Sequence, residues 1–132
     1  EKILNVTFYG AVHQEDILRY MKDSDILFAQ IGENFSSTIP TKIFEYIASG
    51  RRVLLGLPDG PAKDIFKNFY GVEIFKVGSF SDFVRTYEKL LDTLFDESCR
   101  KSNLELIERR YIREKTMSSY LNKLQTISEY PY

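Results

Sequence analysis

The sequence of 132 residues contains only one cysteine and one histidine, and this scarcity excludes several kinds of site. No disulfide can form within the chain, because Cys99 has no second thiol to pair with. A His-rich metal site and a thiolate zinc site are both excluded, since each needs several ligands of one type. The chain also lacks the G-x-G-x-x-G fingerprint of dinucleotide-binding folds and the phosphate-loop motif.

Cys99 and His13 are the two residues that could form a nucleophilic dyad. Cys99 falls among helical segments near the C-terminus, far from the predicted strand ends, which favours a small apolar filler over a nucleophile. His13 falls in a strand-end loop, where a ligand contact and simple exposure to solvent both stay open. The pair therefore yields no assigned catalytic residue.

Neither sign of charge dominates, since 18 basic and 19 acidic residues give a net charge of -1 at pH 7. This balance predicts neither a nucleic-acid footprint nor a polybasic membrane patch. The longest purely apolar runs, such as residues 53–55, are too short to span a bilayer, and no signal peptide is visible. We therefore expect a cytoplasmic protein, or one held at the inner face of the membrane by parts outside this sequence.

Short apolar segments alternate with segments of helical spacing along the chain. The strand-like segments are residues 3–9, 26–29, 52–57 and 72–77. The helical segments are residues 15–22, 40–49, 62–69, 83–94 and about 99–129. This alternation predicts one α/β domain over residues 1–132. It is expected to be a Rossmann-like parallel sheet of about four strands, with helices on both faces and extra C-terminal helices.

Ligands of such sheets bind beyond the carboxyl ends of the strands. The loops expected there are residues 10–14, 30–40, 56–61 and 77–81. The second is the most informative, because a polar loop leads there from a strand end into the helix predicted over residues 40–49. The start of a helix offers unpaired N–H groups and a positive dipole end, which favour the binding of phosphate.

Two charged residues make this helix a candidate binding element. Lys42, in the first turn, has the wrong sign for the helix dipole and costs stability unless an anion is present. Glu45 lies one turn beyond Thr41 on the same face, where its carboxylate can accept two hydrogen bonds from a vicinal diol. The alternative is a surface contact of Lys42 with Glu45 or Tyr46 that contributes roughly a few tenths of a kcal/mol.

The run K-I-F-E-Y-I-A-S-G at residues 42–50, followed by R-R-V-L-L-G, resembles the C-terminal signature of a known family. This is the large retaining glycosyltransferase family with the GT-B fold, glycosyltransferase group 1. Other segments resemble that family in the same order along the chain. Residues 6–10 are similar to its V-x-F-x-G strand, and residues 24–27 are similar to the start of its next strand. Gly60, Asp64 and Ile65 resemble its G-G-x-x-E-x-I turn, and Gly71 resembles the glycine before its last strand. The helix start P-x-K-x-x-E-Y resembles branches involved in surface polysaccharide assembly.

The resemblance implies a binding site for a nucleoside diphosphate sugar, the donor. Its residues would be Glu45, Lys42, Thr41, Thr38, Ser37 and Val12. Glu45 would hold the ribose, and Lys42 with the N–H groups at the helix start would neutralise the diphosphate. Ser37 or Thr38 would contact the sugar or a phosphate by position, and Val12 would pack on the base. Many members carry a further glutamate where Ser37 stands, so that carboxylate is missing here.

The implied activity is transfer of a sugar from this donor to a hydroxyl acceptor, with no cofactor and no metal. No general base is evident, which agrees with a retaining enzyme whose leaving group does much of the proton transfer. The family places two more strands and an acceptor-binding N-terminal domain before the segment that begins here. The resemblance therefore implies a partial C-terminal domain of a GT-B fold, inactive alone, whose partners are the donor and the missing N-terminal domain.

Two other interpretations stay open. A non-catalytic nucleotide-binding or regulatory module, such as a receiver domain, needs an acidic cluster at the end of the first strand, where Tyr9, Gly10 and Ala11 stand instead. A structural Rossmann-like interaction module predicts that Lys42 and Glu45 pair with each other and do not respond to ligands.

Overall fold

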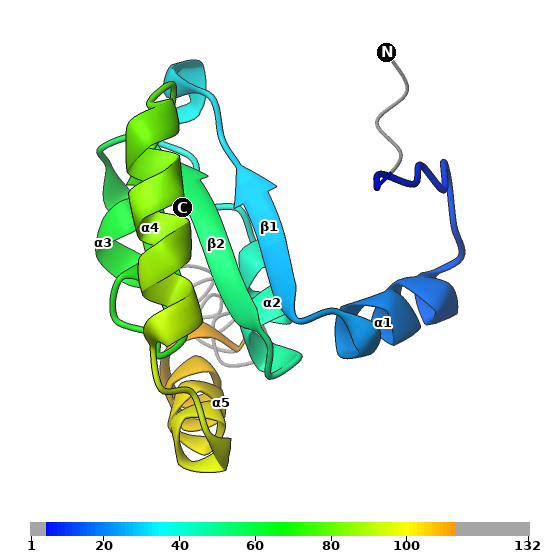
Figure 1. Cartoon of the computed structure of the whole chain (residues 1–132). Coiled ribbons are helices and arrows are strands. Elements are labelled where there is room, and N and C mark those ends of the chain that lie inside the picture. The colour runs from blue at the N-terminus through cyan, green and yellow to red at the C-terminus, as the bar shows by residue number, and fades with distance from the viewer. Residues whose placement is uncertain (1–4, 113–132) are drawn as a thin grey trace, which may run out of the picture.

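Three short strands form a parallel sheet in the computed structural model, which describes residues 5–112. The strands are β1 (Ile26–Gln30), β2 (Arg52–Leu57) and β3 (Val72–Lys76), in the order β1-β2-β3. Leu27 aligns with Val53, and Leu55 aligns with Ile74. All three strands therefore end at the same edge of the sheet, as the arrowheads in Figure 1 show for β1 and β2.

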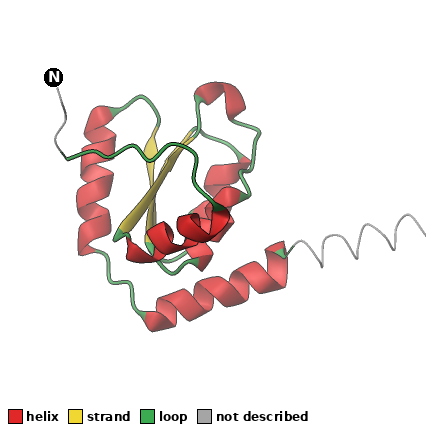
Figure 2. Cartoon of the chain, turned by 90° about the vertical axis from the view of Figure 1, so that its right-hand side faces the viewer, coloured by secondary structure: helices red, strands yellow, loops and turns green. Residues whose placement is uncertain are grey.

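Helices cover the sheet and its ends. They are α1 (Gln14–Asp23), the short 3-10 helix η1 (Glu33–Phe35), α2 (Lys42–Ala48), α3 (Pro61–Phe66), α4 (Phe80–Asp92) and α5 (Glu97–Tyr111). Figure 1 shows α4 in front of the sheet and α2 behind it, with α1 standing to the side of β1. Figures 1 and 2 both place α5 across one end of the sheet, which Figure 1 shows to be the end opposite the arrowheads. The structure thus confirms an α/β fold with helices on both faces of a parallel sheet.

The central strand β2 is buried on both faces, because its side chains alternate between two hydrophobic clusters. Val53, Leu55 and Leu57 pack with Ile43 of α2 and Phe66 of α3 on one face. On the other face, Leu54 of the same strand packs with Phe75 and with Leu90 of α4. This explains why residues 52–57 read as a continuous apolar run rather than an alternating one.

The predicted strand over residues 3–9 is wrong for the residues that the structure describes. Residues 5–9 are not a strand, and residues 3 and 4 lie outside the described part. Phe8 and Tyr9 are 92% and 62% exposed, so this segment buries no apolar face. A strand also needs a neighbour to pair its N–H and C=O groups, and no strand within residues 5–112 pairs with residues 5–9. The sheet of residues 5–112 therefore has three strands rather than about four.

The other predicted strands are confirmed within one residue at their ends. The helix predicted over residues 40–49 begins at Lys42, and the helix predicted over residues 62–69 ends at Phe66. The long helical prediction over residues 99–129 matches α5 as far as Tyr111, and residues 113–129 lie outside the described part. Within residues 5–112, no helix has both the length and the hydropathy that crossing a membrane requires.

Candidate functional site

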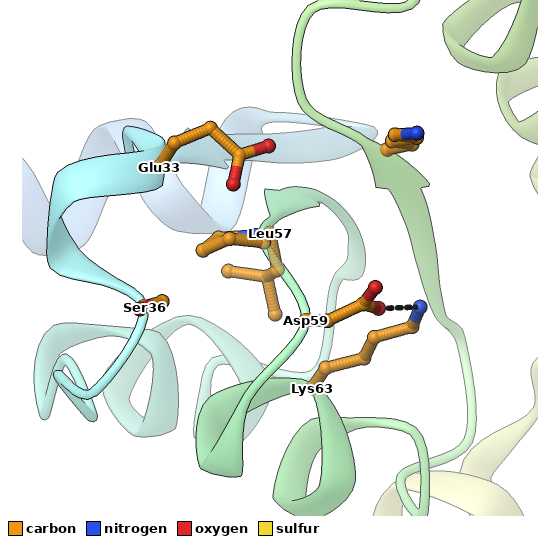
Figure 3. Close-up of a pocket in the computed structure, with 7 residues that line it drawn as sticks. Glu33, Ser36, Leu57, Asp59 and Lys63 are labelled. Carbon is orange, nitrogen blue, oxygen red and sulfur yellow. Dashed lines mark hydrogen bonds and ion pairs between the residues drawn. The ribbon is translucent and has the colours of Figure 1, made fainter.

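A pocket of about 480 Å³ opens at the carboxyl ends of the strands (Figure 3). We call it the strand-end pocket; its lining residues are Glu33, Ser36, Leu57, Pro58, Asp59, Lys63 and Lys76. They come from η1 and the residue after it, from the end of β2 and its following turn, from α3, and from the last residue of β3. The carboxyl end of a parallel sheet is the place where open α/β folds bind ligands.

A close backbone approach joins two walls of the strand-end pocket. A Cβ atom at Gly60 would collide with the carbonyl oxygen of Ser36, so only glycine fits at this point of the turn after β2. The N–H of Ile31 donates to the carbonyl oxygen of Gly56 at 2.9 Å, which continues the pairing of the two strands into the loop that carries Glu33. The loop after β1 and the turn after β2 are thus held against each other.

One ion pair lies inside the strand-end pocket. The Lys63 ammonium donates to Asp59 Oδ1 at 2.7 Å, as the dashed line in Figure 3 shows. This hydrogen bond is the main reason why the pKa of Asp59 is lowered and the pKa of Lys63 is raised. Within residues 5–112, Glu33 and Lys76 form no ion pair. The pocket therefore contains one carboxylate and one ammonium that the described part of the chain does not neutralise by contact.

The end of β3, which carries Lys76, is fixed by Asp82. The backbone N–H of Lys76 donates to Asp82 Oδ2 at 2.6 Å, and Asp82 also pairs with Arg85. The backbone hydrogen bond first, and Arg85 second, lower the pKa of Asp82. Ser79 caps α4 by accepting a hydrogen bond from the N–H of Asp82. These contacts anchor α4 to β3 beside the pocket.

Comparison of the chain with protein families, with curated proteins and with solved structures gives no match. The function must therefore be inferred from the residues and their arrangement. Within residues 5–112, no group of three or more His, Cys, Asp or Glu side chains is arranged to hold a metal ion.

None of the six binding residues predicted from the sequence lines the strand-end pocket. Ser37, Thr38, Thr41 and Lys42 are exposed in the loop and helix start that follow Ser36, the pocket-lining residue. The helix start offers fewer free N–H groups than the sequence predicted. The N–H groups of Ile43 and Phe44 already donate to the carbonyl oxygens of Pro40 and Thr41, at 3.3 and 3.1 Å.

Glu45 lines a different pocket of about 430 Å³, between α1, α2 and α5. Its other lining residues are Gln14, Leu18, Met21, Lys22, Ala48, Ser49 and Arg100. No ion pair joins Glu45 to Lys42. Both charges therefore face solvent on α2 without an ion pair between them.

The remaining candidates, Val12, His13 and Cys99, do not line the strand-end pocket. Val12 is half-buried in the segment before α1, and His13 is exposed at the start of that helix. Cys99 is half-buried in the first turn of α5, where its N–H donates to Asp96 Oδ1 at 3.0 Å. That position agrees with the prediction that Cys99 lies in the C-terminal helices, away from the strand ends.

Sequence reasoning missed the four charged residues of the strand-end pocket, which are Glu33, Asp59, Lys63 and Lys76. Glu33 and Asp59 fall within loops that were predicted to border a ligand, so the loop positions were a usable signal. Lys63 and Lys76 fall inside a predicted helix and a predicted strand, and nothing local distinguishes them from other surface lysines. Their convergence depends on how separate elements meet in space.

Proposed function

We propose that this chain is the donor-binding portion of a glycosyltransferase that transfers a sugar from a nucleoside diphosphate sugar to a hydroxyl acceptor. The observation that carries the proposal is the strand-end pocket, a polar cavity at the carboxyl ends of a parallel sheet, next to the polar loop over residues 36–41. The proposed fold of the whole domain is Rossmann-like, as in the C-terminal half of a GT-B enzyme.

The chemistry of the strand-end pocket suits a sugar diphosphate. The Lys63 and Lys76 ammonium groups can attract phosphate oxygens, whereas Glu33 and the hydroxyl of Ser36 can accept hydrogen bonds from sugar hydroxyls. A ligand with both an anionic part and several hydroxyl groups would satisfy both sets. This mixture of cations and carboxylates suits such a ligand better than a purely apolar one.

The proposed roles of the loop and helix residues follow the resemblance. Glu45 would hold the ribose from the separate pocket between α1, α2 and α5. Lys42 and Thr41 would face the diphosphate, and Ser37 or Thr38 would contact the sugar or a phosphate. Exposure of these side chains on the loop and α2 leaves them accessible to a ligand. Val12 would pack on the base if the segment before α1 closes over the nucleotide.

The proposed mechanism rests on positioning and on neutralising the departing diphosphate. It requires no cofactor, and the acceptor would be bound by a further domain of the same protein in the cytoplasm. The alternative of a structural module predicted an ion pair between Lys42 and Glu45. That pair is not formed, and the titration below measures whether the two residues respond to a ligand, which the structural module predicts they do not.

The test is a two-dimensional NMR titration of the chain with UDP, GDP and UDP-sugars. We expect shifts at residues 36–45 and at the strand-end pocket, with one base preferred, and weaker binding in Glu45→Ala. Glu105→Ala, an exposed glutamate on α5, is the matched control and should bind like the wild type. Shifts that are unchanged by Glu45→Ala would remove the role given to that residue. The absence of any shift at millimolar ligand would reject donor binding by this chain.

A further inference from the structure

The ion pair in the strand-end pocket differs from its neighbour on the same helix. Lys63 contacts Asp59 at 2.7 Å, and Lys67 contacts Asp64 at 2.8 Å, so the two pairs have nearly the same geometry. Both residues of the first pair line the strand-end pocket, whereas neither residue of the second pair does. Only the first pair therefore stands where a ligand would enter.

Asp59 is held only through its contact with Lys63. Its side chain is 92% exposed, and among the described residues its only side-chain hydrogen bond is to that ammonium. The Asp59 carboxylate can therefore turn into solvent at small cost, because water replaces the ammonium as its partner. Lys63 is half-exposed and carries the other charge of the pair.

The charges of the strand-end pocket sum to zero while Asp59 is in place. Glu33 and Asp59 contribute two negative charges, and Lys63 and Lys76 contribute two positive ones. Lys76 is close enough to lower the pKa of Asp59 further, so the two ammonium groups act on the same region. Removing the carboxylate of Asp59 would leave a net positive pocket with two free ammonium groups.

We propose that the strand-end pocket is an anion site in which Lys63 and Lys76 bind the phosphate groups, and that Asp59 is a built-in competitor for Lys63. Before an anion binds, the Asp59 carboxylate holds the Lys63 ammonium in an ion pair. An entering phosphate oxygen replaces it, and Asp59 swings to solvent. The inference rests on the proposed function in one respect, since the anion it assigns to the pocket is the diphosphate of the donor.

This competition makes an unusual prediction, because loss of a pocket residue should strengthen binding. Asp59→Asn should bind inorganic pyrophosphate about three- to tenfold more tightly than the wild type, since the ligand no longer displaces a carboxylate or meets its repulsion. Lys63→Met and Lys76→Met should each weaken binding at least several-fold.

The experiment is isothermal titration with inorganic pyrophosphate at low ionic strength, with two-dimensional NMR to locate the binding site. Asp64→Asn is the matched control, because it removes the same charge one turn away without changing a residue that lines the pocket. Asp64 also helps to raise the pKa of Lys63, but less than Asp59 does, so this variant should tighten binding less than Asp59→Asn. If Asp59→Asn does not fold, Asp59→Ser provides the same test.

The inference is overturned if about 20 millimolar pyrophosphate produces no shifts in the strand-end pocket, because the Kd would then lie far above the millimolar range. Equal tightening in Asp59→Asn and Asp64→Asn, or no tightening in Asp59→Asn, would also overturn it. Failure of the proposed function gives a different result. In that case pyrophosphate binds with the expected variant pattern, but UDP, GDP and UDP-sugars bind no better than pyrophosphate itself. Nucleotide-sugar binding that is indifferent to Lys63→Met and Asp59→Asn would leave the function standing and reject the anion site.

Discussion

The side-chain amide of Asn103 forms two hydrogen bonds with the backbone of Tyr70, 33 positions earlier in the chain. Asn103 Oδ1 accepts from the Tyr70 N–H at 2.9 Å, and its Nδ2 donates to the Tyr70 carbonyl oxygen at 2.8 Å. Asn103 is only 2% exposed. This paired contact fastens α5 to the turn that precedes β3, and so fixes the end of the sheet opposite the strand-end pocket.

We expect Asn103→Ala to reduce the free energy of unfolding by about 2 kcal/mol, because it removes two part-buried hydrogen bonds to the backbone of Tyr70. Chemical denaturation with urea measures the change. Asn68→Ala is the control, since its exposed amide donates only to carbonyl oxygens of Asp64 and Ile65 in α3, the helix just before it. A loss below about 0.5 kcal/mol in Asn103→Ala would show that water replaces the amide.

Gly60→Ala should disturb the strand-end pocket directly. The added Cβ collides with the carbonyl oxygen of Ser36, so the turn after β2 must move away from the loop after β1, at a cost of about 1–3 kcal/mol. We expect NMR shifts at Ser36 and weaker pyrophosphate binding. Gly78→Ala is the control: Gly78 has φ +81°, but a Cβ there meets nothing within 4 Å. Gly78→Ala should lose about 1 kcal/mol of stability and leave the strand-end pocket unchanged. Equal NMR shifts of the pocket residues in both variants would contradict this account.

Acid should weaken the anchor between β3 and α4 through Asp82. Folding lowers the pKa of this carboxyl below its ordinary value of 3.8, mainly through the backbone N–H of Lys76 and then through Arg85. Its stabilising contribution is therefore present above pH 3.8 and is lost as the pH falls further, toward the folded-state pKa. Melting temperatures should differ between the wild type and Asp82→Asn near pH 6, and the difference should shrink toward pH 3.

A second variant separates the two causes of the lowered pKa at Asp82. Arg85→Met removes the ion pair but keeps the hydrogen bond from the backbone N–H of Lys76, which is the larger cause. The stability of Arg85→Met should therefore still fall with acid over the same pH range. A constant difference between the wild type and Asp82→Asn at every pH would mean that the carboxyl is not linked to folding.

Several parts of the fold follow from local sequence patterns. The uncharged run after Arg52 predicted a strand buried on both faces, because neither its odd nor its even positions are polar. Gly50 directly follows the helix predicted over residues 40–49, where a glycine in the left-handed region is common, and its φ is +77°. The loops after β1 and β2 were expected to border a ligand, and both contribute to the strand-end pocket. The resemblance that suggests a glycosyltransferase remains a prediction.

Other features depend on which segments meet, and the sequence by itself did not determine them. Residues 5–9 have the composition of a strand, but composition cannot supply the neighbouring strand that a ladder of hydrogen bonds requires. Three contacts join different elements or turns: Gly60 with Ser36, Lys63 with Asp59 near Lys76, and Asn103 with Tyr70.

The sequence alone determined the alternation of strands and helices, because burial period and backbone preference act between neighbours in the chain. The tertiary structure alone decided which charged side chains share the strand-end pocket and which amide holds α5 in place. Those choices depend on side-chain packing between distant segments, such as Tyr70 and Asn103, which are 33 positions apart, and local periodicity carries no information over such separations.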